Sequence, residues 1–165
     1  MVLRFILVLI LGIMSVFAES IIMADKIVIK KSTRMLYLFS GGEAVNKYHI
    51  TLGRVPVGDK EVEGDMKTPE GAYSLDYRQY SNDYYKSLHV SYPNASDKAH
   101  AKTLGQSAGG MIMIHGTPPS WSLSPYGDWM NVLIDWTEGC IAMANDDMDE
   151  VWEQTTNGTL VVIVP

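Results

Sequence analysis

The sequence has little cysteine and no boundary between modules. Cys140 is the single cysteine among 165 residues, so the chain has no internal disulfide. The four histidines include no close-spaced pair, and with one cysteine they make a poor zinc site, so no metal is expected. There is no low-complexity tract, internal repeat or long Pro/Gly/Ser linker. A chain of this size and composition predicts one domain with a sizeable core.

Positive charge is missing from the C-terminal part of the chain. No Lys or Arg follows Lys102, and the net charge of the whole sequence is −6. This charge argues against nucleic acid or an anionic lipid surface as a partner. The carboxylates after Lys102 form either a solvated acidic face or a cleft for an amine-bearing ligand: Asp128, Asp135, Glu138, Asp146, Asp147, Asp149, Glu150 and Glu153.

Long apolar runs are also absent, apart from one near the N-terminus. Residues 5–17 follow Arg4 and are too few for a membrane-spanning helix, which is typical of a secretory signal peptide. Cleavage is expected after Ala18, with Ala24 as a second site, or else the segment stays as an uncleaved anchor. No cysteine follows the run, which excludes a lipoprotein anchor. The expected organisation is a signal peptide over residues 1–18 and one domain over residues 25–165.

The pattern of apolar residues predicts a mostly β domain, a β-rich α+β fold with two short helices. The first helix follows Asn94, with Asp97 in capping-box position, and the second begins at Asn145 or Asp146. Residues 54–71 read as a long ordered loop, and such loops are usually functional or mobile. Strands are expected at residues 26–31, 35–39, 44–53, 72–77, 87–92, 111–115 and 159–164.

An exported protein with one free thiol either buries it or uses it. Burial is the commoner fate of cysteine, so the neighbouring residues must decide between the two. His115 and Cys140 each lie at the end of an apolar run beside a glycine, and an imidazole in hydrogen-bond reach of a thiol takes its proton. The amides of Gly139 and Cys140 are candidates for binding an oxyanion. The alternative for His115 is a core histidine that is hydrogen-bonded to a carbonyl group.

Two motifs carry a resemblance to a known family. Residues 114–118 (IHGTP) and 135–143 (DWTEGCIAM) resemble the signature of the L,D-transpeptidase catalytic domain, also called the YkuD or ErfK/YbiS family. In that family a His-Gly is followed by Ser/Thr-x-Gly-Cys. Residues 64–71 (GDMKTPEG) and 88–94 (LHVSYPN) resemble the branch of the family with a DWTxGC signature, so the resemblance covers most of the chain.

The resemblance implies a YkuD-like β-sandwich that processes peptidoglycan stem peptides in the bacterial periplasm or cell envelope. Cys140 would attack the carbonyl carbon of diaminopimelate in a donor tetrapeptide, release D-alanine and form a thioester. His115 would be the general base, oriented by the carbonyl group of Gly116, and backbone amides near Gly139 would hold the oxyanion. No cofactor is needed. An amine or water would then resolve the acyl-enzyme.

Two positions depart from the commoner family motif. Glu138 stands where many members have a second histidine, and Ala142 stands where relatives often have an arginine. A carboxylate near the sulfur opposes thiolate formation, which makes an imidazolium at His115 more necessary. Three functions therefore remain open. They are transpeptidation, hydrolysis as an L,D-carboxypeptidase or as an amidase that releases a wall-linked lipoprotein, and wall binding without catalysis.

Further positions are candidates for contact with substrate. His89 lies on an expected strand that can neighbour residues 111–115 and line the cleft, or it is a surface histidine of that strand. Tyr92 contacts ligand or shapes the turn after this strand, and Thr137 and Glu138 flank Cys140 in the motif. Aromatic residues between His115 and Cys140 form either a lid over the site or part of the core: Trp121, Tyr126, Trp129 and Trp136.

Overall fold

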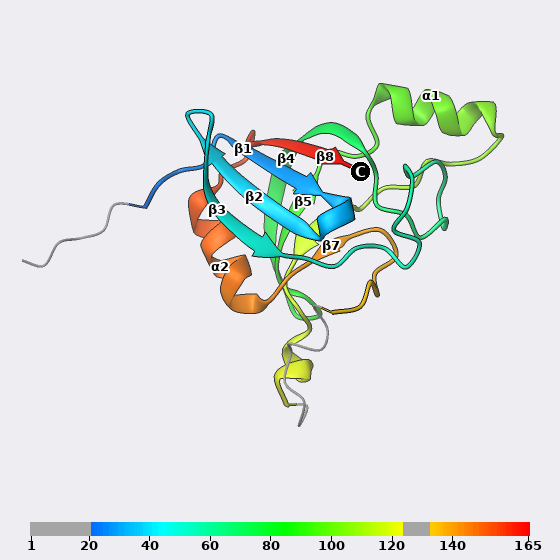
Figure 1. Cartoon of the computed structure of the whole chain (residues 1–165). Coiled ribbons are helices and arrows are strands. Elements are labelled where there is room, and N and C mark those ends of the chain that lie inside the picture. Colours follow the sequence, from blue (N-terminus) through cyan, green and yellow to red (C-terminus); the bar gives the residue numbers. More distant parts are fainter. Residues whose placement is uncertain (1–20, 124–132) are drawn as a thin grey trace, which may run out of the picture.

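The computed structural model describes residues 21–123 and 133–165 (Figure 1). The expected signal peptide over residues 1–18 lies outside the described residues, as do Tyr126 and Trp129. Within the described part, the chain is mostly β, with two α-helices and two short 3₁₀ helices, as the sequence predicts for the α-helices and the strands. No helix in these two segments is long and apolar enough to span a membrane.

The described strands form one hydrogen-bonded sheet in the order β3-β2-β1-β8-β4-β5-β6-β7. Strand β1 pairs in parallel with β8, which joins the first and last described strands of the chain at the centre of the sheet. The strand bounds are β1 Lys26–Lys30, β2 Met35–Ser40, β3 Glu43–His49, β4 Gly71–Ser81, β5 Tyr85–Val90, β6 Met113–His115, β7 Ile141–Ala142 and β8 Leu160–Val164.

The long strand β4 turns this sheet back on itself. Residues 71–74 of β4 pair with β8, whereas Leu75 and residues 77–81 pair with β5, with a register shift between Leu75 and Tyr77. Such irregularities bend a strand and increase its twist. The two ends of the sheet then meet, because Thr51 bridges to Ala142 and Gly53 bridges to Thr137. The layers of the expected sandwich are therefore two halves of one continuous sheet.

The core lies between the two halves of the sheet. Alternate residues of β1 and β2, such as Ile27, Ile29 and Leu36, are fully buried, as the period of two in a half-buried strand requires. Strand β6 is buried along its whole length, which suits a strand covered on both faces. Each fully buried aliphatic side chain contributes about 1.5–3 kcal/mol of hydrophobic stabilisation.

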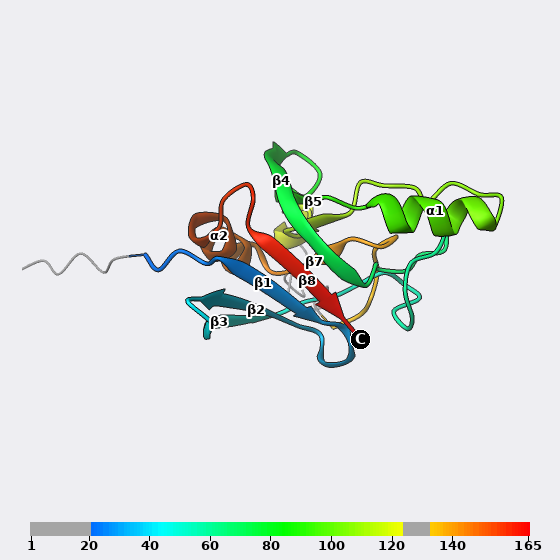
Figure 2. The same ribbon diagram turned by 90° about the horizontal axis from the view of Figure 1, so that it is seen from above.

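The two helices have different relations to the sheet (Figure 2). Helix α1, Ala95–Thr103, stands apart from the strands, and its capping box at Asn94 and Asp97 confirms the predicted start. Helix α2, Asn145–Gln154, joins the two halves of the sheet. It does so because Tyr48 of β3 donates a hydrogen bond to Glu150, and Tyr85 of β5 donates one to Asp149.

Three expected strands differ in length from the observed ones by two residues or more. The strand predicted over 111–115 begins only at Met113, because Met111 has a left-handed φ of 57° that interrupts extended backbone. The strand predicted over 44–53 ends at His49, and residues 51 and 53 make isolated bridges instead. Strand β4 continues to Ser81, four residues past its predicted end at Tyr77. Strand β7 was not predicted, since two residues are too few to show a period.

Residues 54–70 form a loop that a buried lysine ties together. Lys31, in the 3₁₀ helix η1 (Lys31–Thr33), is only 2% exposed. Its ammonium group donates to the carbonyl oxygens of Gly58 and Thr68 and lies 2.8 Å from a carboxylate oxygen of Glu70. One side chain thus holds both ends of the loop, and its charge is paired as burial requires.

Replacement of this lysine is expected to loosen the loop. Lys31→Met leaves two carbonyl groups and the Glu70 carboxylate without their donor, so we expect the free energy of unfolding to fall by about 2–4 kcal/mol. Urea titration followed by fluorescence measures the change. Lys47→Met, at an exposed position on β3, is the matched control and is expected to change stability by less than about 0.5 kcal/mol. Equal stability of both variants would contradict the role of Lys31.

Candidate active site

His115 is held in one orientation at the end of β6. Its Nδ1 lies 2.7 Å from the carbonyl oxygen of Gly116, and the residue is 3% exposed. Because a carbonyl oxygen only accepts hydrogen bonds, Nδ1 carries the proton in the neutral ring and Nε2 is left as an acceptor. Gly116 has no room for a side chain, since an added Cβ would collide with the amide oxygen of Asn145.

Aromatic rings cover His115. The ring of Tyr84 lies 4.7 Å from the imidazole, and the ring of Trp136 lies edge-on at 5.7 Å. Trp121, in the 3₁₀ helix η2 (Pro119–Leu123), packs on Trp136 at 4.8 Å. Burial lowers the pKa of His115 to about 4, against the opposing effect of the Gly116 carbonyl group. The imidazole is therefore neutral at physiological pH, and the imidazolium expected from the sequence is not the resting form.

Cys140 follows a tight turn that Thr137 closes. The Thr137 hydroxyl donates to the carbonyl oxygen of Cys140 at 2.7 Å and accepts the N–H of Gly139 at 3.1 Å. Gly139 has a φ of +134°, and a Cβ there would lie 2.7 Å from the carbonyl oxygen of Lys67. Only glycine fits this conformation and this approach. The motif therefore needs its threonine and glycine to shape the turn that presents Cys140.

The thiol of Cys140 is protonated in this environment. Burial raises the pKa of Cys140, and Glu138 raises it further, while a backbone contact with Met113 and the charge of Lys60 oppose the rise. The Sγ atom donates a weak hydrogen bond to the carbonyl oxygen of Met111, 3.5 Å away. Glu138 itself is exposed, so its effect on the thiol is electrostatic.

The sheet register places Cys140 and His115 on the same face. His115 pairs with Ala142 in the parallel β6–β7 ladder. Side chains alternate along a strand, so Cys140, two residues before Ala142, points to the face that carries His115. Cys140 and His115 both lie in the described part of the chain, and no hydrogen bond joins the thiol to the imidazole. The thiol contacts the carbonyl oxygen of Met111, and Nδ1 of the imidazole contacts that of Gly116.

The start of the motif is anchored by a salt bridge. Arg34 contacts both carboxylate oxygens of Asp135, with Nη2 at 2.6 Å, and the amide of Leu52 donates to the same carboxylate at 2.9 Å. Bidentate arginine–carboxylate pairs fix geometry as well as charge. The Asp135 carboxylate therefore connects the segment before Cys140 to Arg34, the residue that immediately precedes β2.

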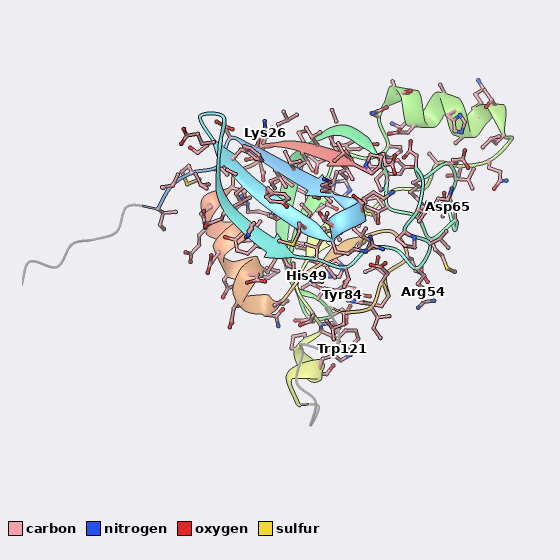
Figure 3. The ribbon with its side chains drawn as sticks, in the orientation of Figure 1. Lys26, His49, Arg54, Asp65, Tyr84 and Trp121 are labelled. Atoms are coloured by element: carbon pink, nitrogen blue, oxygen red, sulfur yellow. The ribbon has the colours of Figure 1, made fainter. Side chains whose placement is uncertain are left out.

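The loop of residues 54–70 approaches the turn before Cys140, where its Lys67 carbonyl oxygen would lie 2.7 Å from a Cβ at Gly139. Within it, the Asp65 carboxylate accepts the amides of Glu61, Val62 and Lys67 and lies 2.8 Å from the ammonium group of Lys60. Burial alone would raise the pKa of Asp65, but these contacts hold it below its ordinary value. Figure 3 shows Asp65 away from Tyr84 and Trp121.

The predicted substrate contacts differ in exposure. His89 is 9% exposed and pairs with Met113 on β6, so it lies on the face of the sheet that carries His115, and its Nδ1 lies 2.6 Å from a carboxylate oxygen of Asp76. Glu138 is exposed. Tyr92 and Thr137 are buried, and both hydroxyls donate to backbone carbonyl groups. Contact of these four side chains with substrate stays a prediction.

Several residues at the site carry no signal in the sequence. Lys31, Arg34 and Tyr84 lie more than 50 residues from Cys140 in the chain, and only the tertiary fold brings them to the site.

The Trp136 indole N–H is buried and has no partner among the described residues. Within the same residues, no three His, Cys, Asp or Glu side chains form a group that holds a metal. A polar cavity of about 380 Å³ near Arg34 and Asp135 includes neither His115 nor Cys140.

Comparison with known proteins identifies the family. The model of the family described as YkuD, L,D-transpeptidase catalytic domain, matches residues 24–163. The chain therefore belongs to this family, and the resemblance carried by its two motifs is confirmed. The mostly β fold with two α-helices agrees with that of solved L,D-transpeptidases.

Individual relatives are similar over about half of their own length. The Escherichia coli (strain K12) protein named "Putative L,D-transpeptidase YafK" is 32% identical over 80% of this chain and 46% of that protein. The helical cell shape determining protein Pgp2 from Campylobacter jejuni is 27% identical, with a TM-score of 0.61 over 83% of this chain and 46% of that chain. The L,D-transpeptidase from Xylanimonas cellulosilytica, 15% identical with a TM-score of 0.54 over 88% of this chain and 62% of that chain, shares the fold.

The raised pKa of Cys140 predicts how its reactivity depends on pH. We expect alkylation of the folded protein by iodoacetamide to reach half its maximum rate above about pH 8.5, the ordinary pKa of a thiol. Intact mass measured against time at each pH gives the profile. The same thiol in the guanidinium-unfolded protein is the reference and is expected to titrate at a lower pH. A plateau below neutral pH in the folded protein would show an activated thiolate instead.

Proposed function

We propose that the protein is an exported cysteine L,D-transpeptidase that acts on peptidoglycan stem peptides through a thioester at Cys140. The observation that carries this proposal is the orientation of His115 by Gly116 on the face of the sheet that also bears Cys140. Membership of the YkuD family supplies the reaction class. Export rests on the apolar segment of residues 5–17, which lies outside the described residues.

Acylation begins from a neutral thiol and a neutral imidazole. The S–H turns from the Met111 carbonyl group toward Nε2 of His115, which takes the proton as sulfur attacks the peptide carbonyl carbon. The Gly116 carbonyl group then stabilises the imidazolium through Nδ1–H. Because its pKa is low, this imidazolium readily gives the proton to the leaving amine as the C–N bond breaks. The base form of His115 persists until the pH falls to about 4.

The oxyanion needs a donor other than Gly139. The N–H of Gly139 is engaged by the Thr137 hydroxyl, so of the two candidate amides the one of Cys140 is the better donor. The fixed turn presents this amide next to the sulfur. Thr137 and Gly139 thus contribute by shaping the turn rather than by binding the oxyanion.

His89 is the proposed contact for a substrate carboxylate. Ala142 is fully buried and paired with Thr51, so no cationic side chain extends from the position where relatives often have arginine. His89 lies on the face of the sheet that carries His115, paired with Met113, and its Nδ1 lies 2.6 Å from a carboxylate oxygen of Asp76. Tyr77 stacks on its ring at 4.5 Å and holds its orientation.

Hydrolysis is the second candidate function, and Ala142 favours it. Without a cation at this position, one contact that orders the substrate in relatives is missing, and water competes more easily for the thioester. The reaction would then be that of an L,D-carboxypeptidase, or of an amidase acting on a wall-linked lipoprotein. Both functions share the Cys140 thioester, so one experiment tests their common step.

Formation of an acyl-enzyme is the direct test of catalysis. Incubation with a stem tetrapeptide or a carbapenem is expected to add the mass of the acyl group to the native protein and none to Cys140→Ala. His115→Ala is expected to reduce adduct formation at least about 100-fold while the protein remains folded by circular dichroism. Absence of an adduct on the native protein under reducing conditions would contradict the proposed catalysis and favour a wall-binding module without catalytic activity.

Product masses distinguish transfer from hydrolysis. With purified muropeptides, transpeptidation is expected to yield cross-linked dimers, whereas hydrolysis yields tripeptides alone. Liquid chromatography with mass detection measures both, and Cys140→Ala is the control for uncatalysed products. Tripeptides as the only product would replace transpeptidation with the hydrolytic function.

A further inference from the structure

The peptide group between Gly116 and Thr117 is held at both of its polar ends. Its carbonyl oxygen, which belongs to Gly116, lies 2.7 Å from Nδ1 of His115. Its N–H, which belongs to Thr117, donates to Oδ1 of Asn145 at 2.8 Å. A peptide group is planar, so the contact that fixes the N–H also fixes the direction of the carbonyl group. The Asn145 side chain is therefore linked to the imidazole through one rigid unit.

Gly116 makes this outside contact necessary. A Cβ at Gly116 would collide with Oδ1 of Asn145, so the close approach of the two residues requires glycine. Glycine also has wide backbone freedom, which leaves the peptide group after it free to turn unless something holds it. The N–H of Gly116 itself donates to the carbonyl oxygen of Lys86 at 3.1 Å, so it anchors only the preceding peptide group. Within the described residues, the hydrogen bond to Asn145 is what holds the N–H of Thr117.

Helix α2 does not need the Asn145 side chain for its own start. Asn145 is the first residue of this helix, and its N-cap residue Ala144 makes no side-chain cap hydrogen bond. Alanine has a higher intrinsic helix propensity than asparagine, so a polar side chain at this position brings the helix no advantage. The half-buried Asn145 side chain instead contacts Thr117, which is fully buried and lies 28 residues earlier in the chain.

The direction of the Gly116 carbonyl group decides which ring nitrogen of His115 carries the proton. Neutral imidazole has one N–H donor and one acceptor nitrogen, and a partner at one nitrogen sets the state of the other. With Nδ1–H bound to the carbonyl oxygen, Nε2 is free to accept the proton of the Cys140 thiol. If the carbonyl group turns away, the Nε2–H form of the neutral ring is no longer excluded, and this form cannot take the thiol proton.

We propose that Asn145 is a positioning residue for the reaction, because it fixes the Gly116 carbonyl group and thereby the tautomer of His115 that accepts the thiol proton. The inference rests on the proposed function. When the S–H bond of Cys140 breaks, its proton passes to Nε2, and Nδ1–H stays bound to the Gly116 carbonyl oxygen. The hydrogen bond from Thr117 to Asn145 polarises the same peptide group and strengthens its oxygen as an acceptor.

Two substitutions at Asn145 test the need for its acceptor oxygen. Asn145→Ala removes this oxygen, and we expect acyl-enzyme formation from a stem tetrapeptide to slow about tenfold with KM unchanged, the effect of one hydrogen bond on a rate. Asn145→Asp keeps an acceptor oxygen and is expected to stay close to the native rate. Intact mass measured against time gives the rates. Asp146→Ala, at the exposed next position of α2, is the matched control and is expected to react like the native protein.

Nitrogen NMR of the histidine rings gives a readout that a purely structural role would not change. At neutral pH we expect the Nδ1–H tautomer of His115 in the native protein and a mixture with the Nε2–H tautomer in Asn145→Ala. In Asn145→Asp, the added carboxylate stabilises the imidazolium, so the pKa of His115 is expected to rise above the native value of about 4. Because the neutral ring is lost as the pH falls through this pKa, the acid limb of the rate moves to higher pH.

The outcomes separate this inference from the proposed function. The inference is overturned if either the rate or the tautomer of the folded Asn145→Ala variant stays native. If that variant does not fold, Asn145→Asp decides alone: the Nδ1–H tautomer with a raised pKa of His115 supports the inference, and any other result overturns it. Absence of an acyl-enzyme on the native protein contradicts the proposed function, whereas the tautomers still show whether Asn145 fixes His115.

Discussion

The structure depends on the backbone pairing that joins the residues after β3 to the segment that carries Cys140. Thr51 and Ala142 exchange two N–H to carbonyl hydrogen bonds of 2.8 and 2.9 Å. The amide of Thr137 donates to Leu52 at 3.2 Å, and that of Arg54 donates to Thr137 at 3.0 Å. These bonds close the curved sheet and also fix the turn before Cys140. The same hydrogen bonds therefore close the fold and fix the position of Cys140.

Electrostatics at the site follow from this closed arrangement. The sheet and the aromatic cover exclude water from His115 and lower its pKa, and burial raises the pKa of Cys140. The imidazole and the thiol are thus both neutral at physiological pH. The Gly116 carbonyl oxygen accepts the Nδ1 proton of His115, so the orientation of the ring is already fixed.

The short strand β6 connects the two parts of the candidate site. Met111, which lies just before the strand, contacts the Cys140 thiol, on which the charge of Lys60 in the loop of residues 54–70 also acts. Lys31 and the Lys60–Asp65 pair hold this loop in shape. The last residue of the strand, His115, contacts the ring of Tyr84.

The sequence by itself determined most of the local structure and the chemistry of the pair. The periods of strands β1, β2 and β8, the capping box at Asn94 and the residue types at His115 and Cys140 are local features, and short-range physics suffices to predict them. The tertiary structure decided the rest: the burial that keeps the pair neutral, the hydrogen bonds from the Tyr92 and Thr137 hydroxyls to backbone carbonyl groups, and the contacts of Lys31, Arg34 and Tyr84. These depend on how residues far apart in the chain meet when the sheet closes, and no periodicity or spacing records such contacts.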